Sequence, residues 1–580
     1  MKHTTHRWVL AAALAILAPL AAHAADAGYT DRIIVKYRSA PASSVAQAAQ
    51  MRGTELPAAR MGLAMRSLRV TALGSHVLKA DRKLSLDEAE RLAADIEASD
   101  PNVEYAEPDL IMRAAFTPND PRYNEQWNLF ESAGGINAPA AWDRSTGSGV
   151  VVAVVDTGYR PHADLNANIL QGYDFISDAF TANDGGGRDT DARDPGDWLD
   201  PGDCGPHDPF DLSPSTWHGT HVAGIIAARA NNARGVAGVA YNARIVPARV
   251  LGKCGGSTSD IVDAVIWAAG GSVPGVPANA NPAKVINISL GTTGSCGTSM
   301  QNAIDSARSR GASVIVAAGN DTEDSVNFTP ANCNGVVAVA SVNRSGGQSS
   351  FTNFGALVKL AAPGGERPGA DSNNILSTLN TGTTTPGPDS YGFYRGTSMA
   401  APTVSGVAAL MLSVKPTLKP DDVTFLLQST TRHFPSACSQ CGAGIVNSRA
   451  AVDAATGSPP GIPEVGPNDS TAQAQTIANA NTIVNAAMSS SSDSDYYRVN
   501  LPGGRTLTAT LIPNPNSDYD VDIYDTSGTL VGSARAGTGV VDVATYQYFG
   551  RVAGTYFVRV FYYSGGTGTT TGKYALRLNW

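Results

Sequence analysis

The run Val150-Val-Val-Ala-Val-Val-Asp156 decides the fold of the central part of the chain, because it is a short, unbroken apolar segment that ends at a carboxylate. Similar apolar runs follow at Ile245–Val250, Val285–Leu290, Val314–Ala318 and Val336–Ala340. Stretches with helical character lie between or after them, at 221–230, 258–269, 299–310 and 397–415. Buried strands that alternate with helices are typical of a mostly parallel sheet with helices on both faces, so we predict an α/β domain over residues 116–453.

The segment before this domain has a different character. Residues 25–115 contain a strand-like run at Asp31–Tyr37, an amphipathic helical stretch at 85–98 and an extended end at Val103–Pro108. Ser85 followed three residues later by a glutamate forms a capping box at the start of the helical stretch. This pattern predicts a small, separate α+β unit.

A Pro- and Gly-rich linker, 454–467, separates the α/β domain from residues 468–580. Beyond the linker, short segments alternate polar residues with apolar or aromatic ones, and turns rich in Gly, Asn, Asp and Ser separate them. These segments are Tyr496–Leu501, Thr506–Ile512, Val521–Tyr524, Thr545–Tyr548, Thr555–Tyr563 and Lys573–Asn579. The alternation predicts a C-terminal β-sandwich.

Residues 1–24 have the pattern of a secretory signal peptide. Lys2 and Arg7 precede an apolar run at 8–22, and the triplet Ala-His-Ala24 offers small residues at a cleavage site. The alternative is a membrane anchor, but this run of 15 residues contains Pro19 and is shorter than the roughly 20 residues that span a bilayer. We therefore expect a secreted, extracellular protein without a membrane span.

The composition argues against disorder and against binding of nucleic acid. The 580 residues include 42 basic and 51 acidic side chains, which gives a formal charge of −9 and a sequence pI near 5.5. Nucleic-acid-binding domains need a basic footprint, so we expect no nucleic acid partner. With 42% hydrophobic and 16% charged residues, the chain has enough apolar material for large cores.

The chain contains six cysteines: Cys204, Cys254, Cys296, Cys333, Cys438 and Cys441. An even number of cysteines in an exported chain favours disulfides over metal ligands. Six cysteines allow about 15 connectivities, so the pairs 204–254, 296–333 and 438–441 are a choice by proximity alone. For the last pair, a redox motif is the alternative, but no thioredoxin-like pattern surrounds it, and two cysteines supply half of a structural zinc site.

Three motifs of the α/β region carry residues suited to catalysis. Asp156-Thr-Gly158 follows the first apolar run, whereas His218-Gly-Thr-His-Val-Ala-Gly224 and Gly396-Thr-Ser398-Met-Ala-Ala-Pro402 each open a helical stretch. Each motif alone has another explanation. An aspartic peptidase needs a second carboxylate motif, a helical zinc pair needs histidines four residues apart, and a serine at a helix start is commonly an N-cap.

Together the motifs supply what acyl transfer requires, which is a nucleophile, a base and an acid that orients the base. Ser398 begins a helix, His218 titrates near neutral pH, and Asp156 ends a rigid strand. Ligand sites in such sheets lie beyond the carboxyl ends of the strands. Asn320 follows another strand, and its amide is suited to donate to the oxyanion of a tetrahedral intermediate, a contact worth roughly 3–4 kcal/mol.

The motif order Asp–His–Ser over residues 127–451 resembles that of the subtilisin-like serine peptidases, the subtilases of peptidase family S8. The resemblance implies a catalytic triad of Asp156, His218 and Ser398. It also implies Asn320 as the oxyanion donor. The expected enzyme is a secreted serine endopeptidase that hydrolyses extracellular proteins through an acyl-enzyme, acts as a monomer and needs no organic cofactor.

The resemblance extends to substrate binding and to the flanking units. It implies a primary specificity pocket and a strand-like contact with extended polypeptides, both formed by Ser289, Leu290 and Gly291. Residues 25–115 resemble the inhibitory propeptide of subtilases, and residues 468–580 resemble the bacterial pre-peptidase C-terminal domain. We therefore expect a zymogen that its own propeptide inhibits and that cleaves itself near Ala114–Phe116.

Calcium is the expected ion. Eleven aspartates lie between residues 174 and 211, against Arg188 and Arg193, and carboxylate oxygens are the ligands that calcium prefers. The predicted calcium ligands are Asp164, which resembles a family ligand, and three aspartates of the acidic stretch, Asp194, Asp197 and Asp200. The alternative is a solvated acidic loop.

The sequence offers two candidate residues that could set the preference of the specificity pocket. Phe328-Thr-Pro330 follows Asn320 where the resemblance implies the base of the pocket, so Phe328 is a candidate for narrowing it. Glu323 at the rim would favour a basic substrate residue. Both residues are equally compatible with surface packing, and the prediction is broad specificity with an apolar preference.

Three other functions have some support in the sequence. An esterase of the α/β-hydrolase type needs G-x-S-x-G and the order Ser–Asp–His, whereas Ser398 comes last and lacks that motif. A non-catalytic adhesin would need neither a complete set of catalytic residues nor an inhibitory propeptide. A third possibility gives the C-terminal sandwich the main role, in attachment to a surface.

Overall fold

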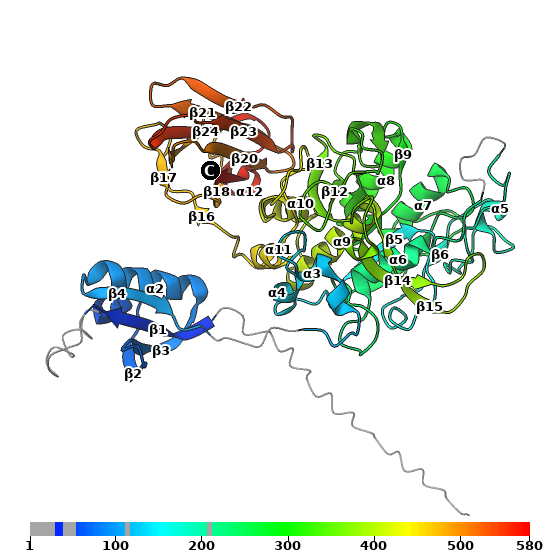
Figure 1. Cartoon of the computed structure of the whole chain (residues 1–580), viewed down its shortest axis with the longest axis horizontal. Coiled ribbons are helices and arrows are strands. Elements are labelled where there is room, and N and C mark those ends of the chain that lie inside the picture. Colours follow the sequence, from blue (N-terminus) through cyan, green and yellow to red (C-terminus); the bar gives the residue numbers. More distant parts are fainter. Residues whose placement is uncertain (1–28, 39–53, 111–116, 206–211) are drawn as a thin grey trace, which may run out of the picture. The chain divides into compact units, whose positions relative to one another are not determined.

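The computed structural model describes residues 29–38, 54–110, 117–205 and 212–580. They belong to two compact units, and the chain passes from the first to the second between Ala114 and Ala115 (Figure 1). The predicted signal peptide, 1–24, and the predicted self-cleavage segment, Ala114–Phe116, lie outside the described residues.

The N-terminal unit is an antiparallel sheet with the order β2-β3-β1-β4 and a helix that packs on it. Its elements are β1 (Tyr29–Tyr37), β2 (Met65–Val70), β3 (His76–Ser85), α2 (Leu86–Ser99) and β4 (Val103–Pro108). Alternate residues of β1, Ile33 and Val35, are fully buried together with Leu92 and Ile96 of the helix. The predicted α+β unit is therefore confirmed.

The second unit is built on a parallel sheet of seven strands in the order β13-β12-β10-β8-β5-β7-β6. In chain order these strands are β5 (Val151–Asp156), β6 (Tyr173–Asp174), β7 (Arg244–Arg249), β8 (Val285–Ile288), β10 (Ser313–Ala317), β12 (Val337–Val342) and β13 (Val358–Pro363). The five predicted apolar runs match β5, β7, β8, β10 and β12 within a few residues. The predicted parallel sheet is confirmed.

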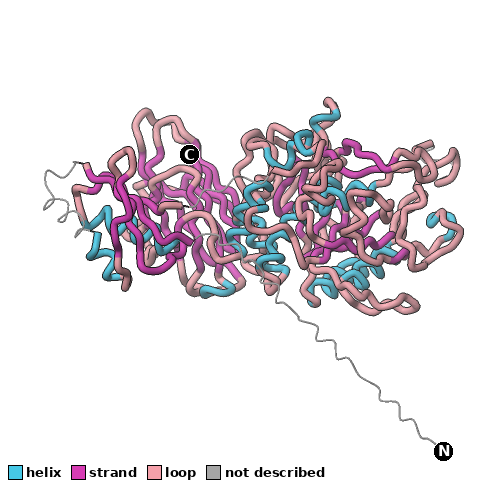
Figure 2. Tube along the Cα trace, turned by 90° about the horizontal axis from the view of Figure 1, so that it is seen from below, coloured by secondary structure: helices cyan, strands magenta, loops and turns pink. Residues whose placement is uncertain are grey.

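Both faces of this sheet are buried, which explains the unbroken apolar runs. Successive residues of a strand point to opposite faces. Val152 and Val154 of β5 join one hydrophobic core, and Ala153 and Val155 join another. Helices cover both sides of the strands (Figure 2). The longer helices are α6 (His218–Ala227), α7 (Thr258–Ala268), α8 (Thr298–Ser309), α9 (Thr397–Val414), α10 (Pro420–Ser429) and α11 (Ser448–Ala455).

Helix α9 is long and apolar enough to cross a membrane by length and composition. However, 83% of it is buried inside the structure, and it packs against α6, β12 and β8. It is therefore a core helix of this domain.

Shorter elements complete the α/β part of the chain. They are η1 (Tyr123–Glu125), α3 (Trp127–Phe130), α4 (Ala138–Trp142), α5 (Ala179–Ala182), β9 (Thr292–Thr293), η2 (Ser325–Asn327), β11 (Phe328–Thr329), η3 (Asp371–Asn373), β14 (Ile375–Asn380) and β15 (Asp389–Tyr394). Two antiparallel pairs lie outside the main sheet, β9 with β11 and β14 with β15.

The C-terminal region folds as two five-stranded sheets with the orders β16-β18-β25-β20-β23 and β17-β19-β24-β21-β22. Its elements are β16 (Ile462–Pro463), β17 (Gln475–Ile477), β18 (Thr482–Ala487), β19 (Ser494–Leu501), β20 (Thr506–Pro513), β21 (Asp518–Asp525), β22 (Leu530–Ala534), β23 (Asp542–Gln547), β24 (Gly554–Ser564), α12 (Gly568–Thr571) and β25 (Lys573–Asn579). Alternate residues of β19, Tyr497, Val499 and Leu501, are buried in the core between the sheets, as expected for a sandwich.

The predicted linker, 454–467, is more ordered than its composition suggests. Helix α11 extends to Ala455, and β16 pairs in parallel with β18. Gly and Pro residues therefore separate two short ordered pieces here, and the first strand of the sandwich begins before residue 468.

The sandwich shares buried contacts with the α/β domain. Arg577 of β25 is 4% exposed and donates to the carbonyl oxygens of Thr431 and Ala443. Lys359 of β13 donates to the carbonyl oxygen of Gly539 at 2.8 Å. A small apolar cluster spans the same contact and contains Ala443, Ile512 and Ala575, with Phe425, Ile483 and Val541 packed against it.

All six cysteines form disulfides, and the pairs are Cys204–Cys254, Cys296–Cys333 and Cys438–Cys441. The pairing chosen by proximity is therefore confirmed.

Candidate active site

Asp156 ends β5 at the carboxyl edge of the parallel sheet and is fully buried. Its Oδ1 accepts hydrogen bonds from Nδ1 of His218 and from the backbone N–H of Thr157, both at 2.8 Å. Its Oδ2 has no hydrogen-bond partner among the described residues. The carboxylate thus fixes the ring orientation of His218 and keeps one acceptor oxygen unused.

His218 is the first residue of α6, and a constrained turn sets its position. Trp217, directly before it, is buried with φ of 50°, a left-handed conformation that is uncommon for a bulky residue. The indole of Trp217 donates to the carbonyl oxygen of Gly382 at 2.7 Å. The turn anchored in this way begins the helix so that the His218 ring meets Asp156.

Electrostatics favour the protonated form of His218. Burial by itself lowers the pKa of the imidazole, but the charge of Asp156 and the hydrogen bond to it outweigh this effect and raise the pKa. The charges of Asp194 and Asp197 act in the same direction. The side chain remains 22% exposed, so it is accessible from outside the core.

Ser398 is the second residue of α9 and follows Gly396, whose φ of 143° only glycine adopts readily. Its hydroxyl donates to the carbonyl oxygen of Ser289 at 3.1 Å, and the Ser289 hydroxyl donates to the carbonyl oxygen of Ser398 at 3.0 Å. Among the described residues, no hydrogen bond joins Ser398 to His218. The Ser398 hydroxyl must rotate before it can donate to His218, and such contacts in catalytic sites commonly tighten when substrate binds.

Asn320 follows β10 and is exposed. Its Oδ1 accepts from the backbone N–H of Thr397 at 2.8 Å and from the Thr397 hydroxyl at 3.0 Å. These two donors fix the orientation of the amide through Oδ1, and the Nδ2 group is the part of the amide that they leave unbonded. Nδ2 has no partner among the described residues and is available as a donor.

Neighbouring strands bring these groups together. Strands β10, β8 and β5 are adjacent, and Asn320, Ser289 and Asp156 stand at or just beyond their carboxyl ends. Helix α9 connects the first two through the contacts of Thr397 and Ser398. The structure thus groups most of the sequence-predicted site at one edge of the sheet.

Sequence reasoning missed two threonines that fix the backbone around His218. The Thr157 hydroxyl donates to Asp194 at 2.7 Å and accepts from the backbone N–H of Gly219 at 3.0 Å. The backbone N–H and the hydroxyl of Thr216 both donate to Asp197 at 2.6 Å. No local signal marks these pairs, because 37 and 19 residues separate their members.

The predicted calcium ligands do not gather into one site. Asp164 is fully buried and accepts from Asn232, from the backbone N–H of Val236 and from Tyr391. Asp194 and Asp197 accept from threonines, as described above, and Asp194 also from the backbone N–H of Gly196. These hydrogen bonds do not exclude a cation, because a carboxylate oxygen can accept a hydrogen bond and still bind calcium, so the four ligands stay a prediction. The described residues do bring together one group of three acids, Asp469, Asp493 and Asp495, in the sandwich.

His221, the second histidine of its motif, has a structural role. Its ring is fully buried, stacks on Tyr394 with centroids 4.6 Å apart, and lies 3.0 Å from the carbonyl oxygen of Gly392. Burial lowers its pKa to about 3, so the ring is neutral. This agrees with the absence of the zinc spacing from the motif.

The residues predicted around the specificity pocket lie in two segments, of which the one at 289–291 contacts Ser398 through Ser289. Gly291, the last residue of the 289–291 segment, is in close contact with the ring of Phe328. Glu323 is exposed in the loop after Asn320. The structure therefore brings Phe328, but not Glu323, against the predicted wall.

A parallel α/β sheet that carries a carboxylate–imidazole pair, a serine at a helix start and a free amide donor at one edge has the arrangement of a serine hydrolase. Comparison with known proteins narrows this class. Residues 147–457 match the model of the Subtilase family. The chain is 48% identical over 517 residues to an extracellular protease of Xanthomonas campestris pv. campestris. The aligned residues are 88% of this chain and 85% of that protein.

Two further similarities agree with this match. An extracellular basic protease of Dichelobacter nodosus is 45% identical over 438 residues, which are 73% of this chain and 71% of that protein. A solved protease structure from Pseudoalteromonas arctica has 61% identity and a TM-score of 0.58, and the match covers 59% of this chain and all of that one. The chain belongs to the subtilase family and is a serine endopeptidase of the subtilisin type.

Proposed function

We propose that the chain hydrolyses peptide bonds through a triad of Asp156, His218 and Ser398, with Asn320 as oxyanion donor. The observation that carries this proposal is the 2.8 Å hydrogen bond between Asp156 Oδ1 and His218 Nδ1 at the carboxyl edge of the sheet. This bond leaves Nε2 of the ring as the group that takes a proton from Ser398.

In the acylation step, Ser398 Oγ attacks the substrate carbonyl carbon while its proton passes to His218 Nε2. The carbonyl oxygen becomes an oxyanion that Asn320 Nδ2 and the backbone N–H of Ser398 stabilise. The C–N bond then breaks, and the proton on His218 moves to the leaving amine. Water repeats the sequence on the acyl-enzyme, which releases the new carboxyl end and restores the Ser398 hydroxyl.

We further propose that the substrates are extracellular proteins, bound as extended strands along Ser289, Leu290 and Gly291. The names of two relatives, an extracellular protease and an extracellular basic protease, support secretion of this chain. A chain in extended form supplies backbone hydrogen bonds for affinity and places one side chain in a pocket for preference.

The N-terminal unit is proposed to be the inhibitory propeptide of a zymogen that processes itself and then acts as a monomer. Its independent α+β fold and the boundary of the compact units at Ala114 and Ala115 support this assignment.

The test uses secreted full-length protein and the variant Ser398→Ala. The variant is expected to accumulate uncut precursor and to lose casein hydrolysis. Ser413→Ala is the matched control, because Ser413 is a half-buried serine near the other end of the same helix. Efficient self-processing by Ser398→Ala, shown by intact mass and N-terminal sequencing, would contradict the mechanism.

Structural calcium remains a proposal that rests on the acidic stretch and on the family resemblance. Removal of bound calcium with excess EDTA is expected to lower the midpoint of thermal inactivation. An unchanged midpoint, measured with and without EDTA at the same ionic strength, would count against a structural ion.

A further inference from the structure

The proposed mechanism places the reacting carbonyl carbon between Ser398 Oγ and Asn320 Nδ2. With substrate bound along Ser289, Leu290 and Gly291, as proposed above, the side chain on the N-terminal side of the scissile bond enters the space between the two chain segments that flank these groups. These segments are 289–291, which follows β8, and 317–320, which ends β10 and continues beyond it. The two strands are hydrogen-bonded neighbours, so their ends form facing walls.

Both walls present a glycine to one aromatic ring. A Cβ atom at Gly291 would lie 2.3 Å from Cε1 and 2.8 Å from Cζ of Phe328. A Cβ atom at Gly319 would lie 3.0 Å from Cγ of the same ring. Because Cγ and Cζ are opposite ends of a phenyl ring, the ring of Phe328 spans the gap between the walls. Any longer side chain at either glycine would displace it.

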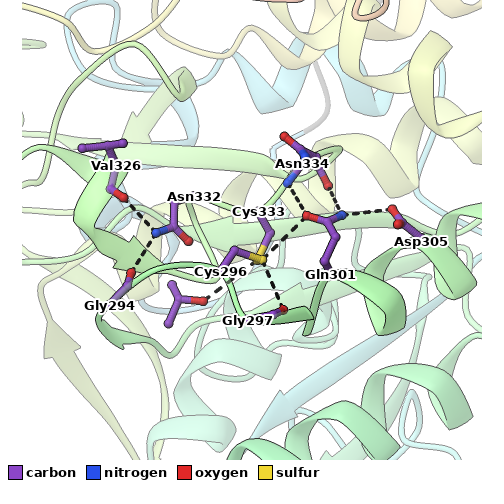
Figure 3. The surroundings of a disulfide bond; sticks show 10 residues. Gly294, Cys296, Gly297, Gln301, Asp305, Val326, Asn332, Cys333 and Asn334 are labelled. Carbon is purple, nitrogen blue, oxygen red and sulfur yellow. Dashed lines mark hydrogen bonds between the residues drawn. A yellow bond between two sulfur atoms is a disulfide. The ribbon is translucent and has the colours of Figure 1, made fainter. Parts of the chain in front are cut away.

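The backbone of Phe328 is held firmly against the first wall. Phe328 pairs with Thr293 in the β9–β11 ribbon, and the backbone N–H of Gly294 donates to the carbonyl oxygen of Asn327 at 2.7 Å. The side chain of Asn332 joins the two segments that flank the ribbon, because its Nδ2 donates to the carbonyl oxygens of both Gly294 and Val326 (Figure 3).

A disulfide closes the same ribbon. Cys296 and Cys333 link the segments that follow β9 and β11, and Gln301 of α8 accepts from the backbone N–H of Asn334 at 2.8 Å (Figure 3). The ring itself is half-buried and packs against the hydrophobic core on that face of the sheet. A ring anchored in this way cannot easily move aside for a large substrate side chain.

We propose that Phe328 fills the primary specificity pocket and restricts the enzyme to substrates with a small residue, glycine, alanine or serine, before the scissile bond. This inference rests on the proposed function of Ser398 and Asn320. It replaces the broad apolar preference expected from sequence. A related contrast exists among serine peptidases of another fold, where a deep slot accepts aromatic residues and a shallow one accepts small residues.

The test compares two tetrapeptide p-nitroanilides that differ only in alanine or phenylalanine before the scissile bond. The wild-type enzyme is expected to prefer alanine by about 100-fold in kcat/KM, because a large side chain cannot be accommodated without displacing the ring. Phe328→Ala is expected to shift this ratio toward phenylalanine by at least about tenfold, and Phe328→Leu by an intermediate amount. Val326→Ala, an exposed position in the same loop, is the matched control and should leave the ratio unchanged.

The outcomes separate this inference from the proposed function. Equal cleavage of both peptides by the wild-type enzyme, or an unchanged ratio in folded Phe328→Ala, would overturn the role of Phe328 and leave the catalytic assignment intact. Absence of any hydrolysis by the wild-type enzyme would instead contradict the proposed function. If Phe328→Ala does not fold, inhibition of the wild type by peptide boronic acids decides: tighter binding of the alanine analogue than of the phenylalanine analogue supports the inference, and the reverse order overturns it.

Discussion

The carboxyl edge of the parallel sheet and the contact between this domain and the sandwich use polar groups in different ways. At the carboxyl edge, Asp156 is fully buried yet one of its oxygens has no partner among the described residues, and His218 stays 22% exposed. Toward the other end of β13, Lys359 and Arg577 are held by carbonyl oxygens where the sandwich meets the α/β domain.

This difference separates groups that serve chemistry from groups that serve stability. A catalytic group must keep a free donor or acceptor for the substrate, and Asn320 Nδ2 meets this condition for its proposed role. A structural group loses stability with every buried donor left unpaired, so its hydrogen bonds are used within the protein. Among the described residues, Asp156 and Asn320 thus keep an acceptor and a donor unused beside Ser398, whereas Lys359 and Arg577 bind carbonyl oxygens at the sandwich contact.

The largest expected effect is that of His218→Ala, which removes the base at the carboxyl edge. We expect kcat for peptide hydrolysis to fall by about 10⁶-fold, because a single triad loss disables the whole unit. His433→Gln is the matched control, since His433 is a partly buried histidine whose pKa is lowered by burial and by the charge of Arg577 of the sandwich. Steady-state kinetics on one peptide substrate measure both variants, and a loss below tenfold in His218→Ala would contradict its assigned role.

Asn320→Ala comes next in size. It removes the free amide donor while Asp156, His218 and Ser398 remain, so kcat should fall by about 10²–10³-fold with little change in KM. Asn242→Ala serves as comparison and should keep kcat, because the Asn242 amide donates to Thr146 before β5 and belongs to neither the proposed triad nor the proposed pocket. If KM rises while kcat is preserved, Asn320 binds substrate and does not stabilise the transition state.

At the sandwich contact, Arg577→Met should lower stability and spare catalysis. It leaves the carbonyl oxygens of Thr431 and Ala443 buried without their donor, at a cost of about 1–3 kcal/mol in the free energy of unfolding. Arg498→Met in the same sandwich is the control, since Arg498 is exposed. Thermal unfolding of both variants measures the difference, and equal midpoints would show that the contact adds no stability.

The smallest effect concerns pH. Burial lowers the pKa of Lys359 to about 8, below its ordinary value near 10.5. Between these values the unfolded chain binds more protons than the folded one, so this group makes stability rise with pH over that window. Lys359→Met should lack this rise. Thermal midpoints of both proteins at pH 7 and pH 9.5 test it, and curves that stay parallel would refute the buried charge.

Sequence patterns predicted the elements that are buried on both faces. The apolar runs predicted β5, β7, β8, β10 and β12. A strand that helices cover on both sides is apolar at every position, so its sequence is a continuous apolar run that is easy to recognise. The pattern failed for β13, where Lys359 interrupts the run. The β14–β15 pair, rich in serine, threonine and glycine, lies outside the main sheet and was also missed.

The site shows the same division. Local motifs were enough to propose Asp156, His218, Ser398 and Asn320, because each lies at a strand end or helix start. The partners of Asp194 and Asp197 could not be read from sequence, since long-range hydrogen bonds determine them. The contact of Phe328 with Gly291, 37 positions earlier, is likewise a tertiary property.

The most direct measurement of the central claim is covalent labelling with a fluorophosphonate, followed by peptide mapping of the adduct by mass spectrometry. We expect a single adduct on Ser398, formed rapidly by the wild-type enzyme and lost in His218→Ala. An adduct on another residue, or equal labelling of Ser398→Ala, would contradict it.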